Sequence, residues 1–212
     1  QLSRGLGDVY KRQHTHVSEN KSEVDHAKSL FPEKNPSADP KKARSYLGIY
    51  NDFGLVRKKS VFAHGIYLED QDYELLSKKE KNGEGSAISF CPTSNLYLGS
   101  GLFPLQKAEN HGIRVGLGTD IGAGTSFNML QTMNEGYKVV QLQKAYTQNP
   151  KDIRTLSAEN AFYLATLGSA RALHLEDKLG NFETGKEADF VVLNPSSTPV
   201  SYTHLTLPTI GC

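Results

Sequence analysis

Three short strand-like runs in this chain each lead to a side chain that can hold a metal ion. The runs cover residues 15–20, 60–65 and 114–120, and the side chains are His16, His64 and Asp120. In a parallel α/β barrel the loops after all strands open onto one face, so residues far apart in sequence can meet there. Two imidazoles, one carboxylate and the additional carboxylate of Glu19 are the groups that a zinc-activated water requires. The pattern therefore predicts a parallel α/β fold with a metal-dependent hydrolytic site.

Strand and helix signals alternate along the chain, which indicates a parallel sheet with right-handed crossovers. Strands are predicted at residues 60–63, 86–90, 113–117 and 190–193, and residues 14–17 are interpreted as the end of another strand. A first helix is expected from a cap at Ser18 or Asn20 to about Leu30. Amphipathic stretches predict further helices at residues 41–53, 69–79, 104–110, 126–146, 157–167 and 169–173. Residues 91–95 are predicted to form a polar loop.

The composition fits one globular domain or a piece of a larger one. The 212 residues carry a formal net charge of +1, which leaves no electrostatic footprint for nucleic acid or a membrane surface. No apolar run approaches the roughly 20 residues that a membrane helix needs, and no signal-peptide pattern leads the chain. Two cysteines argue against a disulfide framework and suit a reducing compartment. We expect a cytoplasmic protein with no nucleic-acid or membrane partner.

The two ends of the chain do not resemble protein sequence. Residues 3–13 and 200–209 can be back-translated into stretches that match sequencing-adapter DNA. The alternative is a disordered tail at each end. We expect residues 1–13 and 200–212 to be adapter artefact, residues 14–175 to form the second half of an α/β barrel, and residues 176–199 to begin a second unit.

Each candidate ligand has an ordinary structural explanation when it is taken alone. His16 could be a satisfied core histidine, and Glu19 a carboxylate favoured by a helix dipole. His64 precedes Gly65, which a turn would explain. Asp120 could cap a helix, but a carboxylate at the end of an apolar strand is costly to bury unless it is paired or bound to metal. The shared strand-end placement of the four residues favours a metal site.

Other chemistry-bearing residues carry weaker signals. His26, His111 and His174 are predicted on helix or loop surfaces. Cys91 precedes Pro92 at a strand end and could line a pocket, but the chain has no Cys-x-x-Cys. The zinc deaminases with a His-x-Glu and a Pro-Cys-x-x-Cys signature are therefore excluded as the type.

Longer motifs extend this pattern to a known family. Thr-His-Val-Ser-Glu-Asn at 15–20, Phe-Ala-His-Gly at 62–65 and Gly-Thr-Asp-Ile-Gly-Ala-Gly-Thr at 118–125 carry the candidate ligands. Cys-Pro-Thr-Ser-Asn-Leu-Tyr-Leu-Gly-Ser-Gly at 91–101 and Gly-Lys-Glu-Ala-Asp-Phe at 185–190 lie between and after them. From His14 to about Pro195 the chain resembles the second half of the bacterial guanine deaminases of the amidohydrolase superfamily.

The resemblance implies a fold and a set of roles. The fold is a partial (β/α)8 TIM barrel, roughly strands 5 to 8 with their helices, plus the start of a C-terminal β-sandwich strand. His16, His64 and Asp120 lie at the zinc ion, and His16, Glu19 and Asp120 contact the substrate. Glu19, His64 and Asp120 are the catalytic residues: Glu19 transfers protons to the purine, His64 orients the water, and Asp120 takes a proton from it. The implied reaction converts guanine and water to xanthine and ammonia.

The chain also departs from this family. The His-x-His of the first barrel strand and the residues that read the guanine edge are absent. We therefore expect the activity to belong to a longer parent, a homodimer acting on a small purine, and this chain alone to be inactive. Two alternatives stay open: an amidohydrolase for another amino- or chloro-substituted purine, pyrimidine or triazine ring, and a non-catalytic fragment.

Overall fold

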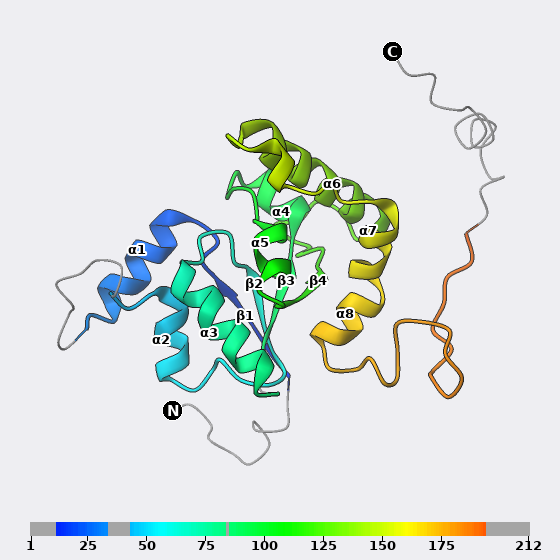
Figure 1. Ribbon diagram of the computed structural model, residues 1–212, viewed down its shortest axis with the longest axis horizontal. Coiled ribbons are helices and arrows are strands. Elements are labelled where there is room, and N and C mark those ends of the chain that lie inside the picture. Colours follow the sequence, from blue (N-terminus) through cyan, green and yellow to red (C-terminus); the bar gives the residue numbers. More distant parts are fainter. Residues whose placement is uncertain (1–11, 34–42, 84, 194–212) are drawn as a thin grey trace.

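A computed structural model describes residues 12–33, 43–83 and 85–193. Its centre is a parallel sheet of four strands in the order β1-β2-β3-β4 (Figure 1). The strands are β1 (Gln13–Val17), β2 (Ser60–His64), β3 (Ala87–Phe90) and β4 (Arg114–Leu117). Neighbours in space are therefore neighbours in sequence, as in one arc of a β/α barrel.

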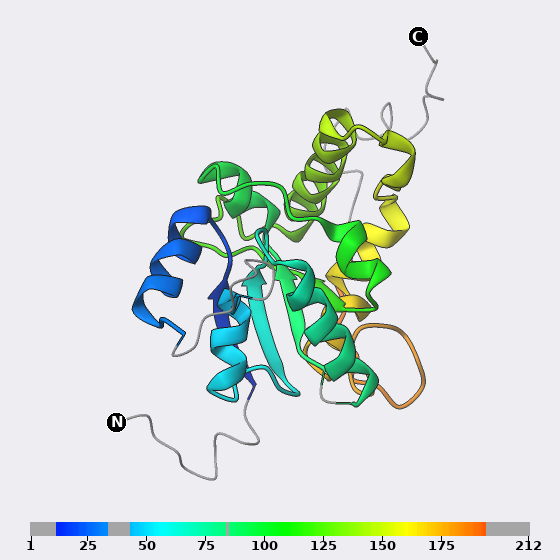
Figure 2. The same cartoon turned by 60° about the vertical axis from the view of Figure 1, so that its left-hand side comes forward.

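Helices follow every strand and cover the sheet (Figures 1 and 2). They are α1 (Lys21–Leu30), α2 (Tyr46–Asp52), α3 (Asp70–Lys81), α4 (Pro92–Tyr97), α5 (Leu105–Asn110), α6 (Met129–Tyr146), α7 (Ala158–Ala165) and α8 (Leu167–Ala172), with a 3-10 turn, η3, at Pro150–Asp152. Figure 1 shows α1 and α2 near β1, and α7 and α8 near β4, at opposite ends of the sheet. The fold class predicted from the sequence is confirmed.

Burial on both faces explains why β2, β3 and β4 are largely apolar. Phe62, Ile88 and Phe90 are fully enclosed in one core that extends from β1 to α7. The ring of Phe90 lies 5.1 Å from that of Phe103, which joins the sheet to the segment before α5. The core fixes the strand ends, and these carry the candidate ligands.

Helix starts agree with the capping residues in the sequence. Asn20 caps α1 by accepting a hydrogen bond from the Glu23 backbone, and the Glu23 carboxylate bonds back to the Asn20 backbone. Ser45 and Ser157 cap α2 and α7. These side chains satisfy N–H groups that a helix start otherwise leaves unpaired.

Two local predictions were wrong. The segment predicted as a polar loop contains α4, because Pro92 occupies the first helical turn, where its missing N–H costs nothing. No strand forms at residues 190–193, whose side chains are exposed, because no described strand lies beside them to pair with. The chain after α8 runs without helix or strand as far as residue 193 (Figure 1).

The predicted terminal artefacts lie mostly outside the described residues. Within residues 1–13 the structure describes only Arg12 and Gln13, and Gln13 begins β1 opposite Ser60. The predicted segment 200–212 is wholly outside the described part of the chain. Among the helices that are described, none has the length and apolar character to cross a bilayer.

Candidate metal centre

The fold brings together three side chains from three separate segments. One ligand atom each of His16, His64 and Asp120 can be chosen so that all three lie within 4.8 Å of one another. His16 Nε2 lies 3.8 Å from Asp120 Oδ1, and His64 Nε2 lies 3.7 Å from Asp120 Oδ2. These distances exceed hydrogen-bond range and leave space between the donor atoms.

Strand pairing places the two imidazoles next to each other. In the β1–β2 register His16 is opposite Ala63, and Val17 is opposite His64. The two rings stack with centroids 5.1 Å apart and planes 19° apart. Asp120 reaches the same point from the loop after β4, two strands beyond β2.

The backbone at this end of the sheet is held in an uncommon conformation. Ser18, His64 and Asp120 have φ values of +52°, +72° and +48°, all in the left-handed region. Such a conformation costs about 1–3 kcal/mol per non-glycine residue and clusters at functional sites. Each residue follows or ends a strand, so the strain turns the chain at the point where the ligands meet.

Glu19 faces the same group of atoms. Its Oε2 lies 3.8 Å from His64 Nε2, and its Oε1 accepts a 2.8 Å hydrogen bond from Ser100 Oγ. The first turn of α1 is capped by Asn20 and Glu23, so the side chain of Glu19 is not used as a helix cap. The Glu19 carboxylate instead lies toward Ser100 and His64.

The chemistry of the donor set fits a zinc ion. The Nε2 atom of His64 is buried and has no hydrogen-bond partner among the described residues. Its other ring nitrogen, Nδ1, lies 2.8 Å from Asn95 Oδ1, an outer contact typical of metal-binding histidines. Side-chain exposure rises from 0% at His64 to 23% at Asp120 and 60% at His16, so the donors open toward solvent.

Sequence reasoning did not single out Asn95 and Ser100. Both are buried polar residues in the run after β3, and they contact His64 and Glu19. Their signal was a cluster of polar residues directly after a buried strand, where side chains meet at the sheet edge. Cys91 is buried in the same run, and burial raises the pKa of its thiol to about 11.

The three histidines predicted on helix or loop surfaces are not among the residues that meet at this centre. His26 is exposed on α1. His111 Nδ1 lies 2.8 Å from the carbonyl oxygen of Lys107. His174 Nε2 lies 3.0 Å from the carbonyl oxygen of Gly85.

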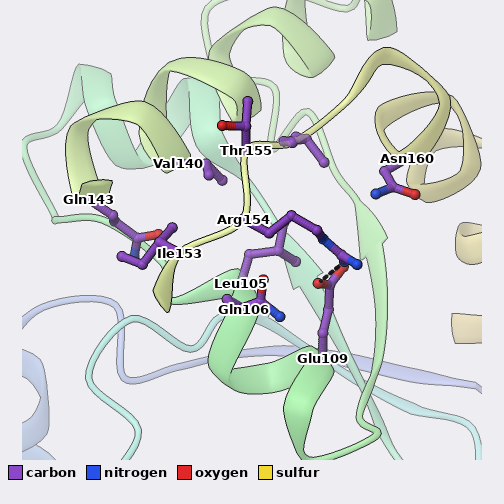
Figure 3. Close-up of a pocket in the computed structure, with 10 residues that line it drawn as sticks. Leu105, Gln106, Glu109, Val140, Gln143, Ile153, Arg154, Thr155 and Asn160 are labelled. Atoms are coloured by element: carbon purple, nitrogen blue, oxygen red, sulfur yellow. Dashed lines mark hydrogen bonds and ion pairs between the residues drawn. The ribbon is translucent and has the colours of Figure 1, made fainter. Parts of the chain in front are cut away.

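Two hollows elsewhere contain none of the four candidate residues. One, between α5, α6 and residues 153–156, has a volume of about 10 Å³ and carries the 2.8 Å Arg154–Glu109 ion pair at its rim (Figure 3). That volume is about the minimum for one water molecule. The other, of about 350 Å³, lies between β4, α5, α7 and α8, away from the ligands.

A parallel α/β arc with a His-His-Asp group at its strand ends is the arrangement typical of metal-dependent hydrolases of the barrel class. The model of the Amidohydrolase family matches residues 8–209, and the chain belongs to that family. The guanine deaminase of Escherichia coli K12 is 52% identical over 187 residues, covering 88% of this chain and 37% of that protein. The chain thus spans about two fifths of the length of this relative.

Solved structures agree in fold. The Escherichia coli guanine deaminase superposes with a TM-score of 0.80 and 47% identity, over 97% of this chain and 44% of that one. A guanine deaminase from C. acetobutylicum, with guanine bound in its active site, superposes with a TM-score of 0.67 and 32% identity. The match covers 81% of this chain and 37% of that one. A zinc-bound adenosine deaminase from Xanthomonas campestris superposes with a TM-score of 0.68 and 26% identity. The match covers 86% of this chain and 37% of that one.

Proposed function

We propose that this chain is part of a zinc-dependent enzyme that hydrolyses guanine to xanthine and ammonia. The observation that carries the proposal is the meeting of His16, His64 and Asp120 with the carboxylate of Glu19 at one point. The guanine deaminases among its relatives, one with guanine bound, favour this reaction over others of the family.

His16, His64 and Asp120 would hold the zinc ion. When bound, zinc acts as a Lewis acid and lowers the pKa of water toward neutrality. The orphaned Nε2 of His64 supports this assignment, because a buried nitrogen without a partner is costly unless something binds it. The two nitrogens and one oxygen are also ligands that zinc prefers.

Glu19 is assigned the proton transfers to the substrate. One of its oxygens is held by Ser100, and the other faces the site beside His64. A carboxyl group held at a fixed point can protonate the purine ring and then pass protons to the departing amine. Its side chain is 17% exposed, which leaves it accessible to a bound purine.

Asp120 and His64 act on the attacking water. Asp120 turns its two oxygens toward His16 and His64, so one can bind while the other takes a proton from the water. His64, buried and held through Nδ1, has the fixed ring orientation needed to orient that water. We infer a small-molecule purine substrate and a homodimeric parent from the resemblance to the family, and a cytoplasmic location from the low number of cysteines.

We infer three ligands, His16, His64 and Asp120, and the resemblance to the family implies that a His-x-His with further ligands and the groups that read the guanine edge lie before the strand that carries His16. The chain accordingly requires further residues to complete the site, and we propose that the 212-residue chain alone is inactive. Sequencing the source DNA upstream of the His14 codon tests this directly. An open frame that carries a His-x-His at a strand end is expected; a frame that stops there contradicts the longer parent.

The decisive assay is ammonia release from guanine by the full-length protein. A site built to bond the guanine edge should reject adenosine and chlorinated triazines by about 10⁴-fold or more. Turnover of those compounds, with none of guanine, would assign the protein to another reaction of the family. Steady ammonia release by the purified 212-residue chain would overturn the proposal that it is inactive.

A further inference from the structure

One segment of the chain holds two of the candidate catalytic residues in place. This β3–α5 segment, Cys91–Gly101, follows β3 and contains α4. Asn95 in α4 bonds to His64, and Ser100 after α4 bonds to Glu19. His64 ends β2 and Glu19 follows β1, so one segment that follows a third strand, β3, contacts both residues.

The contact of Asn95 determines which nitrogen of His64 carries the proton. Asn95 Oδ1 lies 2.8 Å from His64 Nδ1, and the buried Asn95 Nδ2 has no hydrogen-bond partner among the described residues. Because a carbonyl oxygen can only accept a hydrogen bond, we infer that His64 Nδ1 is the donor. A neutral ring with a proton on Nδ1 has its lone pair on Nε2. That atom faces Asp120 and Glu19 at 3.7 and 3.8 Å, too far for an N–H to bond to either.

Ser100 is fixed through its backbone on both sides. Its N–H donates to the carbonyl of Asn95 at 2.9 Å, and its own carbonyl accepts from Tyr67 Oη at 2.8 Å. Gly101 permits the second contact, because its φ is +139° and a Cβ there would lie 2.9 Å from Tyr67 Oη. A backbone hydrogen bond therefore links Ser100, whose hydroxyl holds Glu19, to Asn95, whose side chain holds His64.

The β3–α5 segment also contacts the loop that carries Asp120. Thr93 Oγ1 donates to the carbonyl of Thr119 at 3.2 Å, immediately before Asp120. Thr93 and Asn95 are both buried, and the helical turn between them keeps their spacing constant.

We propose that Asn95 and Ser100 are positioning residues that act as one unit. Asn95 holds the His64 lone pair toward the centre, and Ser100 holds the Glu19 carboxylate beside it. The part played by Ser100 rests on the proposed function, whereas the part played by Asn95 is a property of the metal-free chain. The two parts are tested separately.

The tautomer of His64 is measured by two-bond ¹H–¹⁵N NMR of the metal-free 212-residue chain. His64→Gln identifies the ring among the seven histidines of the chain. In the wild type the proton is expected on Nδ1. Asn95→Asp keeps an acceptor oxygen and should preserve this tautomer, while Asn95→Leu removes it and should yield a mixture of both. Tyr97→Leu, on the exposed side of α4, serves as the control and should match the wild type.

A wild-type proton on Nε2 would overturn the proposal, since it requires the Asn95 amide to donate to Nδ1. An Asn95→Leu spectrum identical to the wild type would overturn it as well. The wild-type spectrum decides the direction of the bond even if Asn95→Leu does not fold. In the full-length protein, Asn95→Leu should weaken zinc binding about 10–100-fold, and Asn95→Asp should restore most of it.

Ser100 is tested by kinetics in the full-length protein. Ser100→Ala should lower kcat by about 10-fold or more, with KM and zinc content nearly unchanged, because only the placement of Glu19 is lost. An unchanged kcat, or a fall in zinc content of the same size, would overturn its positioning role. Absence of guanine turnover in the wild type would instead refute the proposed function, and the NMR result for Asn95 would still stand.

Discussion

Ser45 Oγ donates a hydrogen bond to Asp72 Oδ1, which joins the first turns of two helices. Ser45 is the N-cap of α2, and its hydroxyl also accepts from the Gly48 backbone. The second carboxylate oxygen of Asp72 accepts from the Glu69 backbone at the start of α3. Both side chains are buried, and burial raises the pKa of Asp72 from 3.8 to about 6.

This raised pKa predicts a loss of stability as the pH rises from about 4 to about 6. The folded chain holds the Asp72 proton more tightly than the unfolded chain, so folding is favoured while the group is protonated and less favoured once it ionises. A pKa difference of about 2 corresponds to roughly 3 kcal/mol. Urea unfolding at several pH values should show wild type losing up to that amount relative to Asp72→Asn.

Asp70→Asn is the matched control, since Asp70 lies in the same helix turn with its side chain 87% exposed. Its unfolding free energy should follow that of the wild type across this range. A difference between wild type and Asp72→Asn that does not change with pH would contradict the prediction.

Glu19→Gln should separate proton transfer from metal binding. The amide keeps the size of the side chain and can still accept from Ser100, but it cannot donate and recover a proton. In the full-length protein we expect zinc content to stay constant and kcat on guanine to fall by about 10²–10⁴-fold. Glu23→Gln, which retains a capping residue at α1, should leave kcat unchanged; an equal loss in both variants would refute the role of Glu19.

Two glycines should respond in opposite directions to alanine. A Cβ on Gly136, inside α6, would lie 3.4 Å from Phe90 and 3.6 Å from Leu156, which is ordinary contact. Gly136→Ala should therefore raise the unfolding free energy by about 0.5–1 kcal/mol through helix propensity. A Cβ on Gly116 would lie 3.0 Å from the Ser169 backbone, so Gly116→Ala should lower it by about 1–3 kcal/mol. Urea unfolding of both variants measures the contrast, and equal signs would contradict it.

The sequence predicted the strands well and the segments between them less well. The apolar content of the sequence placed the ends of β2 and β4 to within one residue. Strands that are buried on both faces need apolar side chains at nearly every position, so their bounds are visible in the sequence. The start of α6 was predicted at Ser126, but the helix begins at Met129 with Asn128 as its cap, since either polar residue satisfies the local rules. The strand at residues 190–193 was predicted from composition, but strand formation needs a neighbour that composition does not supply.

The candidate ligands could be proposed from their strand-end positions alone, because parallel strands direct their loops to one side. The contacts of Asn95 and Ser100 could not. They depend on α4, a helix in a segment that the sequence suggested was a loop, and on its packing against two other strands. Local patterns identify groups that can do chemistry, whereas the groups that orient them emerge from tertiary packing.

Cys91 should be unreactive in the folded chain. Burial raises the pKa of its thiol to about 11, with further contributions from Asp120 and Glu19, and the residue is 2% exposed. Only a thiolate is nucleophilic or binds zinc, so at pH 8 this group has neither property. In a Cys212→Ser background, iodoacetamide should label the native chain at least 100-fold more slowly than the urea-unfolded chain. Equal rates would place a reactive thiol next to the proposed zinc ligands and require Cys91 to be counted among them.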